Sequence, residues 1–431
     1  MIRKIFIASV AFISTILGSP AQDFHTFFAD STLRVDYTIA GDTGGTLIFL
    51  DQLTLDPAHT WAGRRHNLNR LPLKGNGDIT VSLPDGTTLY RTSFSTLYSE
   101  WLSTPEAETT PRSYENTFLL PYPRQDVDVT VSLYDMRHDT IATLTHRVKP
   151  DDILIQRPAL NPAPHRYIHK GGSPAEKIDV AILAEGYTVE QMDSFYHHAA
   201  VTVASLADHE PFKSMMDRFN FVAVAAPSKD SGVSVPREGK WLDTTVGSHF
   251  DTFYSDRYLT TPHVKKIHDA LAGIPYEHII VLANTETYGG GGIYNSYTLT
   301  AAGHPLFRPV VVHEFGHSFG GLADEYFYDD DVMSGSYPLD IEPWEQNITT
   351  SGTHPKWKHL VPAGTPLPTP AADADRFPVG AFEGGGYSSR GVFRPADHCR
   401  MRDNQTEGFC PVCQDAIARI IKFYTEENSD K

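Results

Sequence analysis

The feature that most constrains this chain is the stretch from His313 to Glu325, which begins with the pattern H-E-x-x-H. On an α-helix, His313 and His317 lie four residues apart and project from one face, one turn from each other. Two imidazoles at this spacing can bind one Zn²⁺, and Glu314 between them can reach a water on the metal. The pattern therefore predicts a helix that presents two zinc ligands and a general base.

The residues after this helix predict a third zinc ligand. Gly320 and Gly321 give the backbone the freedom to end the helix and turn back, and Asp324 follows the turn. Two histidines and one carboxylate with an open fourth position are typical of a catalytic zinc rather than a structural one. Glu325 is the alternative third ligand, because one residue of turn geometry decides which carboxylate faces the metal. The competing interpretation is an amphipathic helix with two surface histidines.

Length and charge bound the remaining possibilities. A chain of 431 residues exceeds one typical core and predicts two domains. Its hydrophobic content of 40% and charged content of 21% are those of a globular protein. The formal net charge of −17, without a visible basic stripe, argues against nucleic acid or an anionic membrane as a partner.

The N-terminus predicts export. Arg3 and Lys4 precede an apolar run over residues 5–17, and small residues follow up to Ala21. This order is typical of a signal peptide, residues 1–21, and the apolar run is short for a membrane span. An uncleaved anchor is the alternative. Since no later apolar run reaches membrane length, we expect a mature protein without a membrane span that is periplasmic, on the cell surface or secreted.

Residues 22–157 read as an all-β domain. Apolar and polar residues alternate over 33–39, 79–83 and 127–134, and residues 140–144 are suited to pair with the last of these. Several short strands with turn signals predict a β-sandwich. No catalytic cluster is visible in this part. The triplet Arg64-Arg65-His66 is expected in a solvated loop.

The period of the sequence changes after a Pro-rich and Gly-rich stretch at residues 158–175, which we interpret as a linker. Residues 176–431 then form the predicted catalytic domain. Strands alternate with helices in it, which indicates an α/β (α+β) fold. The predicted strands are 178–184, 219–225 and 278–283, and the predicted helices are 188–208 and 263–271.

Several shorter segments carry separate expectations. Gly289 to Gly292 are interpreted as a flexible turn, and residues 293–299 as an edge strand that could pair with an extended peptide or be purely structural. Pro309 suits the start of the zinc helix. Asp329 to Asp331 are expected in a solvated acidic loop rather than a Ca²⁺ site, and residues 362–391 in irregular structure.

The three cysteines, Cys399, Cys410 and Cys413, lie close together in the sequence. An exported chain with three cysteines could form one disulfide and keep a free thiol. The alternative is a second, structural zinc on these cysteines, with His398 or Asp397 as fourth ligand. The spacing leaves both interpretations open, and a helix is expected from about Cys413 to Tyr424.

The stretch from His313 to Glu325, together with Cys399-x-Met401, resembles the metzincin metallopeptidases, and within them the bacterial IgA-specific metallopeptidase family. The resemblance covers the predicted catalytic domain well and the β domain more loosely. It implies a metzincin-like fold, a catalytic zinc, a peptide-bond substrate and a Met-turn beneath the metal. Met401 is the matching residue for that turn, and Met333 is a weaker candidate.

Two departures from the metzincin pattern stand out. The third ligand is usually six residues past the second histidine, where this chain has Ala323; counting from Gly321 moves the ligand to Asp324, as in the snapalysin-like branch. Arg402 follows the methionine where some relatives carry a tyrosine that stabilises the oxyanion, so Tyr387 or His398 could take that role. The spacing of the cysteines is similar to that in archaemetzincins, which favours the second zinc.

The predicted function is that of a zinc metalloendopeptidase of the EC 3.4.24 type acting on proteins or peptides. Zinc would acidify its bound water, and Glu314 would take the proton and return it to the leaving amine. A thermolysin-like site would need Glu342 or Glu345 as third ligand, but Pro343 interrupts any helix there. The alternatives from other classes are a non-catalytic surface binding or adhesion protein with a degenerate site, and a hydrolase of non-protein amides or esters.

Overall fold

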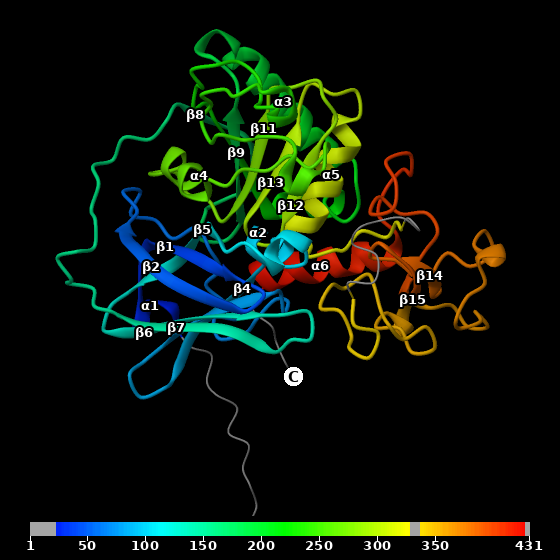
Figure 1. Ribbon diagram of the computed structural model, residues 1–431. Helices are drawn as coiled ribbons and strands as arrows, with labels where there is room; N and C mark the ends of the chain where they lie inside the picture. Colours follow the sequence, from blue (N-terminus) through cyan, green and yellow to red (C-terminus); the bar gives the residue numbers. More distant parts are fainter. Residues whose placement is uncertain (1–22, 328–336, 427–431) are drawn as a thin grey trace, which may run out of the picture.

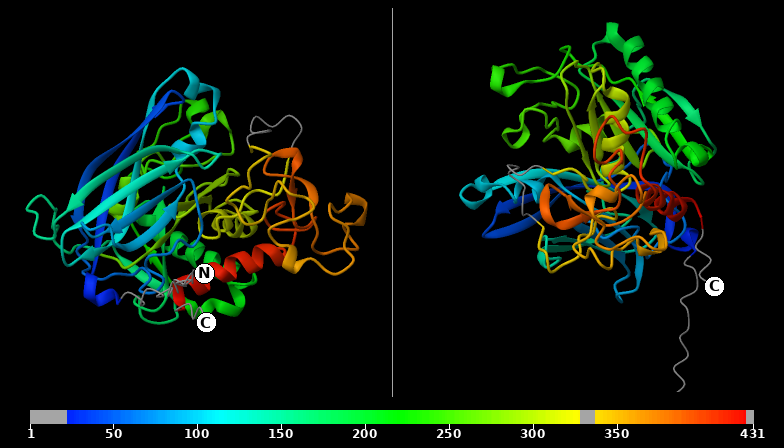
Figure 2. Two further views of the ribbon diagram at one scale, coloured as in Figure 1. Left: turned by 90° about the horizontal axis from the view of Figure 1, so that it is seen from below. Right: turned by 90° about the vertical axis from the view of Figure 1, so that its right-hand side faces the viewer.

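The computed structural model describes residues 23–327 and 337–426. An N-terminal β region lies below a region of mixed sheet and helices, and the C-terminal helix runs between them (Figures 1 and 2). The predicted signal peptide, the loop Asp329 to Asp331 and Met333 lie outside the described residues. Among the helices that the structure describes, none combines the length and the apolar character that a membrane crossing requires.

Two antiparallel sheets make up the N-terminal region (Figure 2). Their inward side chains share one core, to which Tyr37, Phe118 and Val129 belong. The alternation predicted for residues 127–134 is confirmed, because every second residue there is buried. One sheet has the order β2-β1-β5, from β1 (Phe28–Asp42), β2 (Gly45–Leu55) and β5 (Arg112–Pro123); the other has the order β4-β3-β6-β7, from β3 (Gly77–Ser82), β4 (Thr88–Phe94), β6 (Val127–Tyr134) and β7 (Thr140–Val148).

In the basic triplet of this region, His66 is exposed and Arg65 half-buried, but Arg64 is not solvated as expected. Arg64 is only 3% exposed, and its guanidinium donates to the carbonyl of Arg70 (3.2 Å) and to the hydroxyl of Tyr90 (3.2 Å). The same group lies 5.1 Å from the ring centre of Phe423 in the C-terminal helix. The prediction was wrong for Arg64, because the aliphatic stem and the planar head of arginine can both be buried once carbonyls accept its protons.

The second region contains a mixed sheet with the order β12-β13-β11-β9-β10-β8. Its inner strands, β9 (Ile178–Glu185), β10 (Phe219–Val224), β11 (His278–Ala283) and β13 (Tyr297–Ala301), run parallel, and the edge strands β8 (His165–Lys170) and β12 (Gly290–Ile293) are antiparallel. The strands predicted at 178–184, 219–225 and 278–283 are confirmed. β8 lies inside the stretch 158–175 that we interpreted as a linker, where its pairing with β10 makes it part of the sheet.

Helices cover both faces of this sheet. Val180 and Ile182 of β9 share a core with α3 (Met192–Ala207) and α5 (Phe307–Ser318), whereas Ala181 and Leu183 share one with α4 (Val264–Ala270). A strand buried on both faces reads as a continuous apolar run, which is why β9 was recognisable in the sequence. Pro309 lies in the first turn of α5, which begins slightly earlier than expected.

The four glycines do not form the predicted turn. Gly290 to Gly292 belong to β12, the edge strand itself, and the chain turns at Tyr294 to Ser296 instead. Of residues 293–299, expected to form the edge strand, only Ile293 belongs to β12, whereas residues 297–299 belong to β13, which lies between β12 and β11. The interpretation failed because glycine is normally depleted in strands.

The C-terminal part of the chain packs against α5, where Met401 and Phe409 lie next to Gly316. The hairpin of β14 (Phe382–Gly385) and β15 (Ser388–Arg394) lies partly in the stretch expected to be irregular. The predicted C-terminal helix is present as α6 (Pro411–Thr425). The remaining short elements are α1 (Phe24–Phe27), α2 (Leu97–Trp101) and the 3₁₀ turns Pro105–Glu108, Val189–Gln191, Lys213–Arg218, Pro236–Glu238, Thr252–Tyr254, Lys358–Leu360 and Ala371–Asp373.

Candidate active site

Helix α5 presents both predicted histidines on one face. The Nε2 atoms of His313 and His317 lie 3.0 Å apart. Each ring donates its Nδ1 proton to a backbone carbonyl, His313 to Arg400 (2.9 Å) and His317 to Leu322 (2.6 Å). These bonds fix the rings in the tautomer that leaves both Nε2 atoms free to bind a metal.

Asp324 completes the group. The backbone turns back at Gly321, whose φ of +57° is one that glycine adopts at little cost, and brings the carboxylate over α5. Asp324 Oδ1 lies 3.0 Å from His313 Nε2 and 3.3 Å from His317 Nε2. The side chain of Asp324 is 7% exposed, and its Oδ2 accepts a hydrogen bond from the hydroxyl of Tyr387.

The three atoms fit a zinc ion. Ligands of a tetrahedral zinc with bonds of about 2.0–2.1 Å lie about 3.3 Å from one another. The spacings among His313 Nε2, His317 Nε2 and Asp324 Oδ1 are 3.0, 3.0 and 3.3 Å. Asp324 Oδ1 is buried without a hydrogen-bond partner among the described residues. A cation between these atoms would satisfy that oxygen.

The electrostatics of the group also favour a cation. Burial disfavours a charged imidazole, but the carboxylate of Asp324 outweighs burial and raises the pKa of His317 to about 9. The same carboxylate also raises the pKa of His313 above its ordinary value. Conversely, the two histidines hold the pKa of Asp324 far below its usual range, against the effect of burial. The site therefore holds positive charge readily, and a metal would displace protons from the histidines.

Glu314 lies beside the glycine strand. A Cβ atom at Gly290 would lie 2.6 Å from Glu314 Oε1, and one at Gly292 would lie 2.3 Å from the backbone oxygen of Glu314. Only glycine allows β12 and α5 to approach this closely. Burial raises the pKa of Glu314 above its ordinary value.

The outer edge of β12 is already partly paired. Leu259 N–H donates to the carbonyl of Gly290 (3.4 Å), and Gly290 N–H donates to the carbonyl of Arg257 (3.3 Å). An extended peptide would therefore find this position of the edge occupied. Whether the rest of the edge binds a peptide remains a prediction.

The N-terminal region contributes a residue that the sequence did not suggest. Glu100 in α2 lies close enough for its charge to act on His317, Asp324 and Glu314. It accepts a hydrogen bond from the hydroxyl of Tyr258, and burial raises its pKa to about 7. No motif marks Glu100, because only the packing of the two regions brings it to the site.

Met401 lies beneath α5, as expected for the residue that matches the Met-turn. Its side chain is fully buried, and a Cβ at Gly316 would lie 2.7 Å from its sulfur. The carbonyl of Met401 accepts a hydrogen bond from Glu325 N–H (2.8 Å). The segment after Cys399 thus lies directly against α5.

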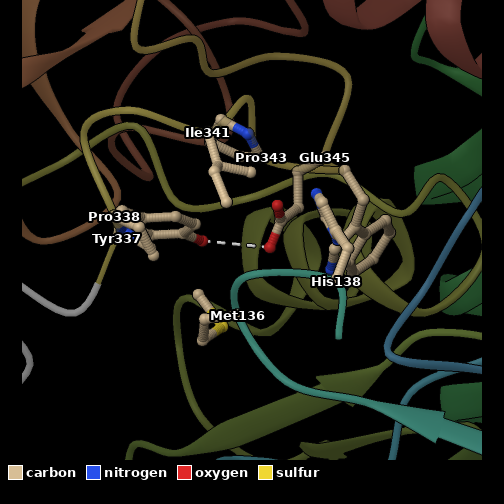
Figure 3. Close-up of a pocket in the computed structure, with 8 residues that line it drawn as sticks. Met136, His138, Tyr337, Pro338, Ile341, Pro343 and Glu345 are labelled. Carbon is tan, nitrogen blue, oxygen red and sulfur yellow. Dashed lines mark hydrogen bonds between the residues drawn. The ribbon is translucent and has the colours of Figure 1, made fainter. Parts of the chain in front are cut away.

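The alternative third ligands lie elsewhere. Glu345 accepts a hydrogen bond from the hydroxyl of Tyr337 (3.0 Å) in a small hollow that it shares with His138 of the N-terminal region (Figure 3). Glu342 accepts a hydrogen bond from Thr349 (2.6 Å). Neither belongs to the group around the two histidines, so the thermolysin-like arrangement is not favoured.

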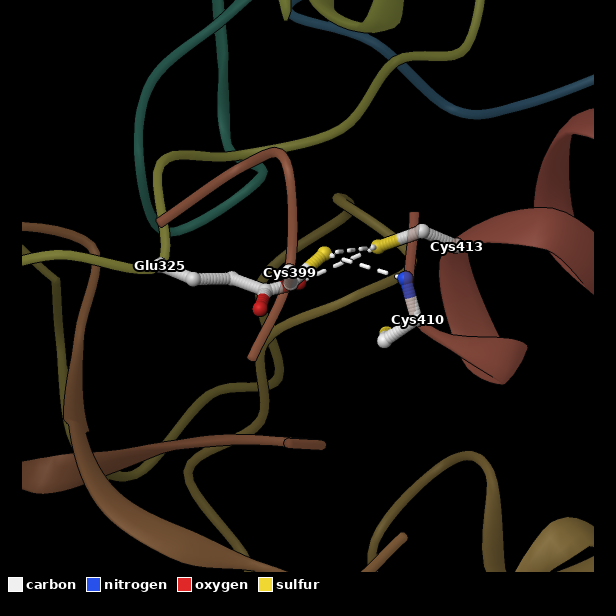
Figure 4. A group of neighbouring side chains, drawn as sticks. All are labelled: Glu325, Cys399, Cys410 and Cys413. Carbon is white, nitrogen blue, oxygen red and sulfur yellow. Dashed lines mark hydrogen bonds between the residues drawn. The ribbon is translucent and has the colours of Figure 1, made fainter. Parts of the chain in front are cut away.

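Glu325, the other fallback ligand, faces a second group. Within residues 23–327 and 337–426, the histidine group and one other cluster could hold a metal, and the other consists of Glu325, Cys399, Cys410 and Cys413 (Figure 4). Glu325 was the alternative to Asp324 as third ligand beside the histidines. Instead, its carboxylate lies 3.0 Å from Cys413 Sγ. In the sequence, only the adjacency of the two acidic residues Asp324 and Glu325 could have suggested that Glu325 belongs to a second group.

The other expectations for the cysteines also need correction. All three are free thiols, so the structure contains no disulfide between them. The side chain of His398 is 70% exposed, and Asp397 accepts a hydrogen bond from Arg394 (2.7 Å). The fourth residue of the cluster is therefore Glu325 and neither of these sequence neighbours. An oxyanion role for His398 is likewise not supported by its exposed position.

Two family models match the chain. One, described as IgA Peptidase M64, matches residues 167–378 and 373–421, and the other, described as Peptidase M64 N-terminus, matches residues 23–145. No curated protein matches. The first match contains both groups of side chains that could hold a metal, and the two matches together agree with a multidomain architecture.

Proposed function

Because the chain belongs to the IgA peptidase M64 family, whose members are peptidases that act on proteins, we propose that it is an exported, zinc-dependent metalloendopeptidase. The observation that carries the proposal is the convergence of His313 Nε2, His317 Nε2 and Asp324 Oδ1 at zinc-ligand spacing. A donor set of two histidines and one carboxylate leaves a coordination position open for chemistry.

In this proposal Glu314 is the general base. Zinc, when bound, acidifies a water and polarises the scissile carbonyl. Glu314, one residue from a ligand, accepts the proton of the attacking water and returns it to the leaving amine. Burial raises its pKa above that of an exposed carboxylate, which makes it a stronger base.

The finer features of the fold belong to the same proposal. The two N-terminal sheets with their common core support a β-sandwich, and the zinc helix with Met401 beneath it supports a metzincin-like catalytic domain. Export rests on the sequence of residues 1–21. A non-catalytic binding or adhesion protein is not favoured, because all three ligands and the base are present together. The family name does not make immunoglobulin the substrate.

The test is the variant Glu314→Gln. We expect zinc content to stay unchanged and peptide hydrolysis to fall by about 10²–10⁴-fold, because the amide fills the space but cannot take a proton. Elemental analysis measures the zinc content, and digestion of a peptide library measures hydrolysis. The exposed Glu286→Gln serves as the matched control and should keep full activity. Normal proteolysis by Glu314→Gln at full zinc content would overturn the assignment of the base.

A further inference from the structure

A second cluster of metal-binding side chains lies against the first site. Cys399, Cys410 and Cys413 gather around the carboxylate of Glu325, and all four residues are buried (Figure 4). Their ligand atoms all lie within 4.8 Å of one another. Cys410 and Cys413 come from the start of α6, Cys399 from the preceding segment and Glu325 from the loop after α5.

The spacing of the sulfur atoms matches a mononuclear zinc. In a tetrahedral site with Zn–S bonds of about 2.3 Å, neighbouring sulfurs lie about 3.8 Å apart. Cys399 Sγ and Cys413 Sγ lie 3.7 Å apart. Soft thiolates select zinc over calcium or magnesium, and four protein ligands with no open position are typical of a structural site.

An unsatisfied carboxylate oxygen points to the same conclusion. Glu325 is fully buried, and its Oε2 has no hydrogen-bond partner among the described residues. An ionised carboxylate buried against three thiolate sulfurs is costly unless a cation joins them. Cys410 N–H donates to Cys399 Sγ (3.3 Å), and the N-terminus of α6 favours negative charge on the sulfurs that it carries.

The surrounding charges suit an anionic metal complex. Three thiolates and one carboxylate around Zn²⁺ leave the complex negatively charged. Two almost fully buried guanidinium groups lie nearby: Arg394, which is also paired with Asp397, attracts Glu325, and Arg400 attracts Cys399. Buried arginines beside the cluster offset a charge that would otherwise be costly in the interior.

We propose that Glu325, Cys399, Cys410 and Cys413 bind a second Zn²⁺, which is structural and holds the loop that carries Asp324 against the catalytic helix. Glu325 and Asp324 are neighbours whose side chains face the two different groups. The loop is therefore fixed at Glu325 while Asp324 faces the histidines.

The connection between the two sites is direct. Glu325 N–H donates to the carbonyl of Met401 (2.8 Å), and the carbonyl of Arg400 accepts the Nδ1 proton of His313 (2.9 Å). The residues just after Cys399 thus contact both a ligand loop and a ligand ring of the first site. This positioning role rests on the proposed function, whereas the second zinc itself does not.

Metal analysis of the full chain tests the proposal. We expect two zinc ions per wild-type chain. In the double variant His313→Ala/His317→Ala we expect one, with zinc-edge X-ray absorption showing three sulfur neighbours at about 2.3 Å. Loss of all zinc from the double variant, or a disulfide between Cys399 and Cys413 found by mass spectrometry, would overturn the second site.

The variant Cys410→Ser tests the link between the sites. We expect it to lose the sulfur-bound zinc and to bind the remaining zinc at least tenfold more weakly than wild type; an unchanged affinity would contradict the positioning role. If this variant does not fold, the double histidine variant still decides the proposal. Wild type and the double variant could each contain one zinc with only sulfur and carboxylate neighbours. That result would support the second site and contradict the proposed catalytic zinc.

Discussion

At the scale of single residues, the adjacent acidic residues Asp324 and Glu325 after α5 explain why two separate ligand groups form. The backbone there is held on both sides: Gly386 N–H donates to the carbonyl of Asp324 (2.8 Å), and Glu325 N–H donates to the carbonyl of Met401 (2.8 Å). In extended chain, successive side chains point to opposite sides. Asp324 therefore faces the histidines, and Glu325 faces the cysteines.

Tyr387 should position Asp324 through its hydroxyl. Tyr387 donates to Asp324 Oδ2 and adopts a φ of +63°, which is unusual for a bulky residue. We expect Tyr387→Phe to weaken zinc binding about 10–100-fold, as removal of a residue that orients a ligand commonly does. Competition with a chromophoric chelator measures the affinity.

A matched control is available in the N-terminal region, where the hydroxyl of Tyr134 donates to Asp78 (3.1 Å). Tyr134→Phe removes the same kind of bond away from the site and should leave zinc affinity unchanged. Equal affinities of wild type and Tyr387→Phe would show that the tyrosine does not orient the ligand. A fall in turnover at saturating zinc would indicate that Tyr387 also contacts the substrate.

At the scale of elements, the site depends on the close approach of β12 to α5. The hydroxyl of Thr298 in β13 donates to the carbonyl of Glu314 (3.2 Å), so the helix is bonded to the sheet next to the glycines. α5 itself is β-prone at Val310 to Val312, yet it is helical because its apolar face packs into the core with α3. Tertiary packing thus determines the conformation of both elements beside Glu314, the helix α5 and the strand β12.

Gly292→Ala should disturb this contact. The new Cβ would lie 2.3 Å from the backbone oxygen of Glu314 and 2.9 Å from His317 Cβ, so the strand or the helix must shift. We expect the free energy of unfolding to fall by about 1–3 kcal/mol, and activity to fall with it. Gly45→Ala is the control, since a Cβ there meets nothing within 4 Å. Equal denaturant midpoints for the two variants would contradict this account.

At the scale of the whole molecule, the N-terminal region is fastened to the catalytic one beside the site. Ser95 N–H donates to the carbonyl of Tyr294 (2.9 Å), and the Asn295 amide donates to the carbonyl of Ser93 (2.8 Å). Both contacts involve the turn between β12 and β13. The β region therefore supports the edge of the sheet next to Glu314, and it brings Glu100 to the site.

The stability of the whole fold should depend on His278 at low pH. This histidine of β11 is 5% exposed, contacts the rings of Phe319 and Tyr424, and has its pKa lowered from 6.5 to about 3 by burial. As the pH falls below 6.5, the unfolded chain takes up a proton that the folded one resists. Its contribution to stability, about 4–5 kcal/mol, is complete above pH 6.5 and lost towards pH 3.

His278→Phe removes this dependence. As the pH falls from 6.5 to 3, the free energy of unfolding of the variant should rise relative to that of wild type by about 1.4 kcal/mol for each pH unit. Urea unfolding of the chelator-treated proteins at several pH values measures the difference without interference from zinc loss. The exposed His165→Phe should give a curve parallel to that of wild type. Parallel curves for His278→Phe as well would exclude the buried histidine as the cause.

Much of this protein follows from local pattern. Periodicity located β1, β3, β6 and β7 of the N-terminal region and β9, β10 and β11 of the second, because buried strands read as apolar runs and half-buried strands alternate. It did not locate β2, β4 and β5. The H-E-x-x-H spacing located His313, Glu314 and His317, because helix geometry alone places them together. The glycine strand and the buried Arg64 were misread, since each contradicts a general preference that tertiary packing overrides.

The sequence by itself determined the residue types, their helical spacing and the turn that follows α5, because these depend on interactions between near neighbours. Only the tertiary structure decided that Asp324 and not Glu325 joins the histidines, that Glu325 joins three cysteines from the far end of the chain, and that Glu100 reaches the site. The last two outcomes depend on contacts between segments separated by about 75 residues or more, and the orientation of Asp324 depends on contacts with Gly386 and Tyr387, which no local pattern encodes.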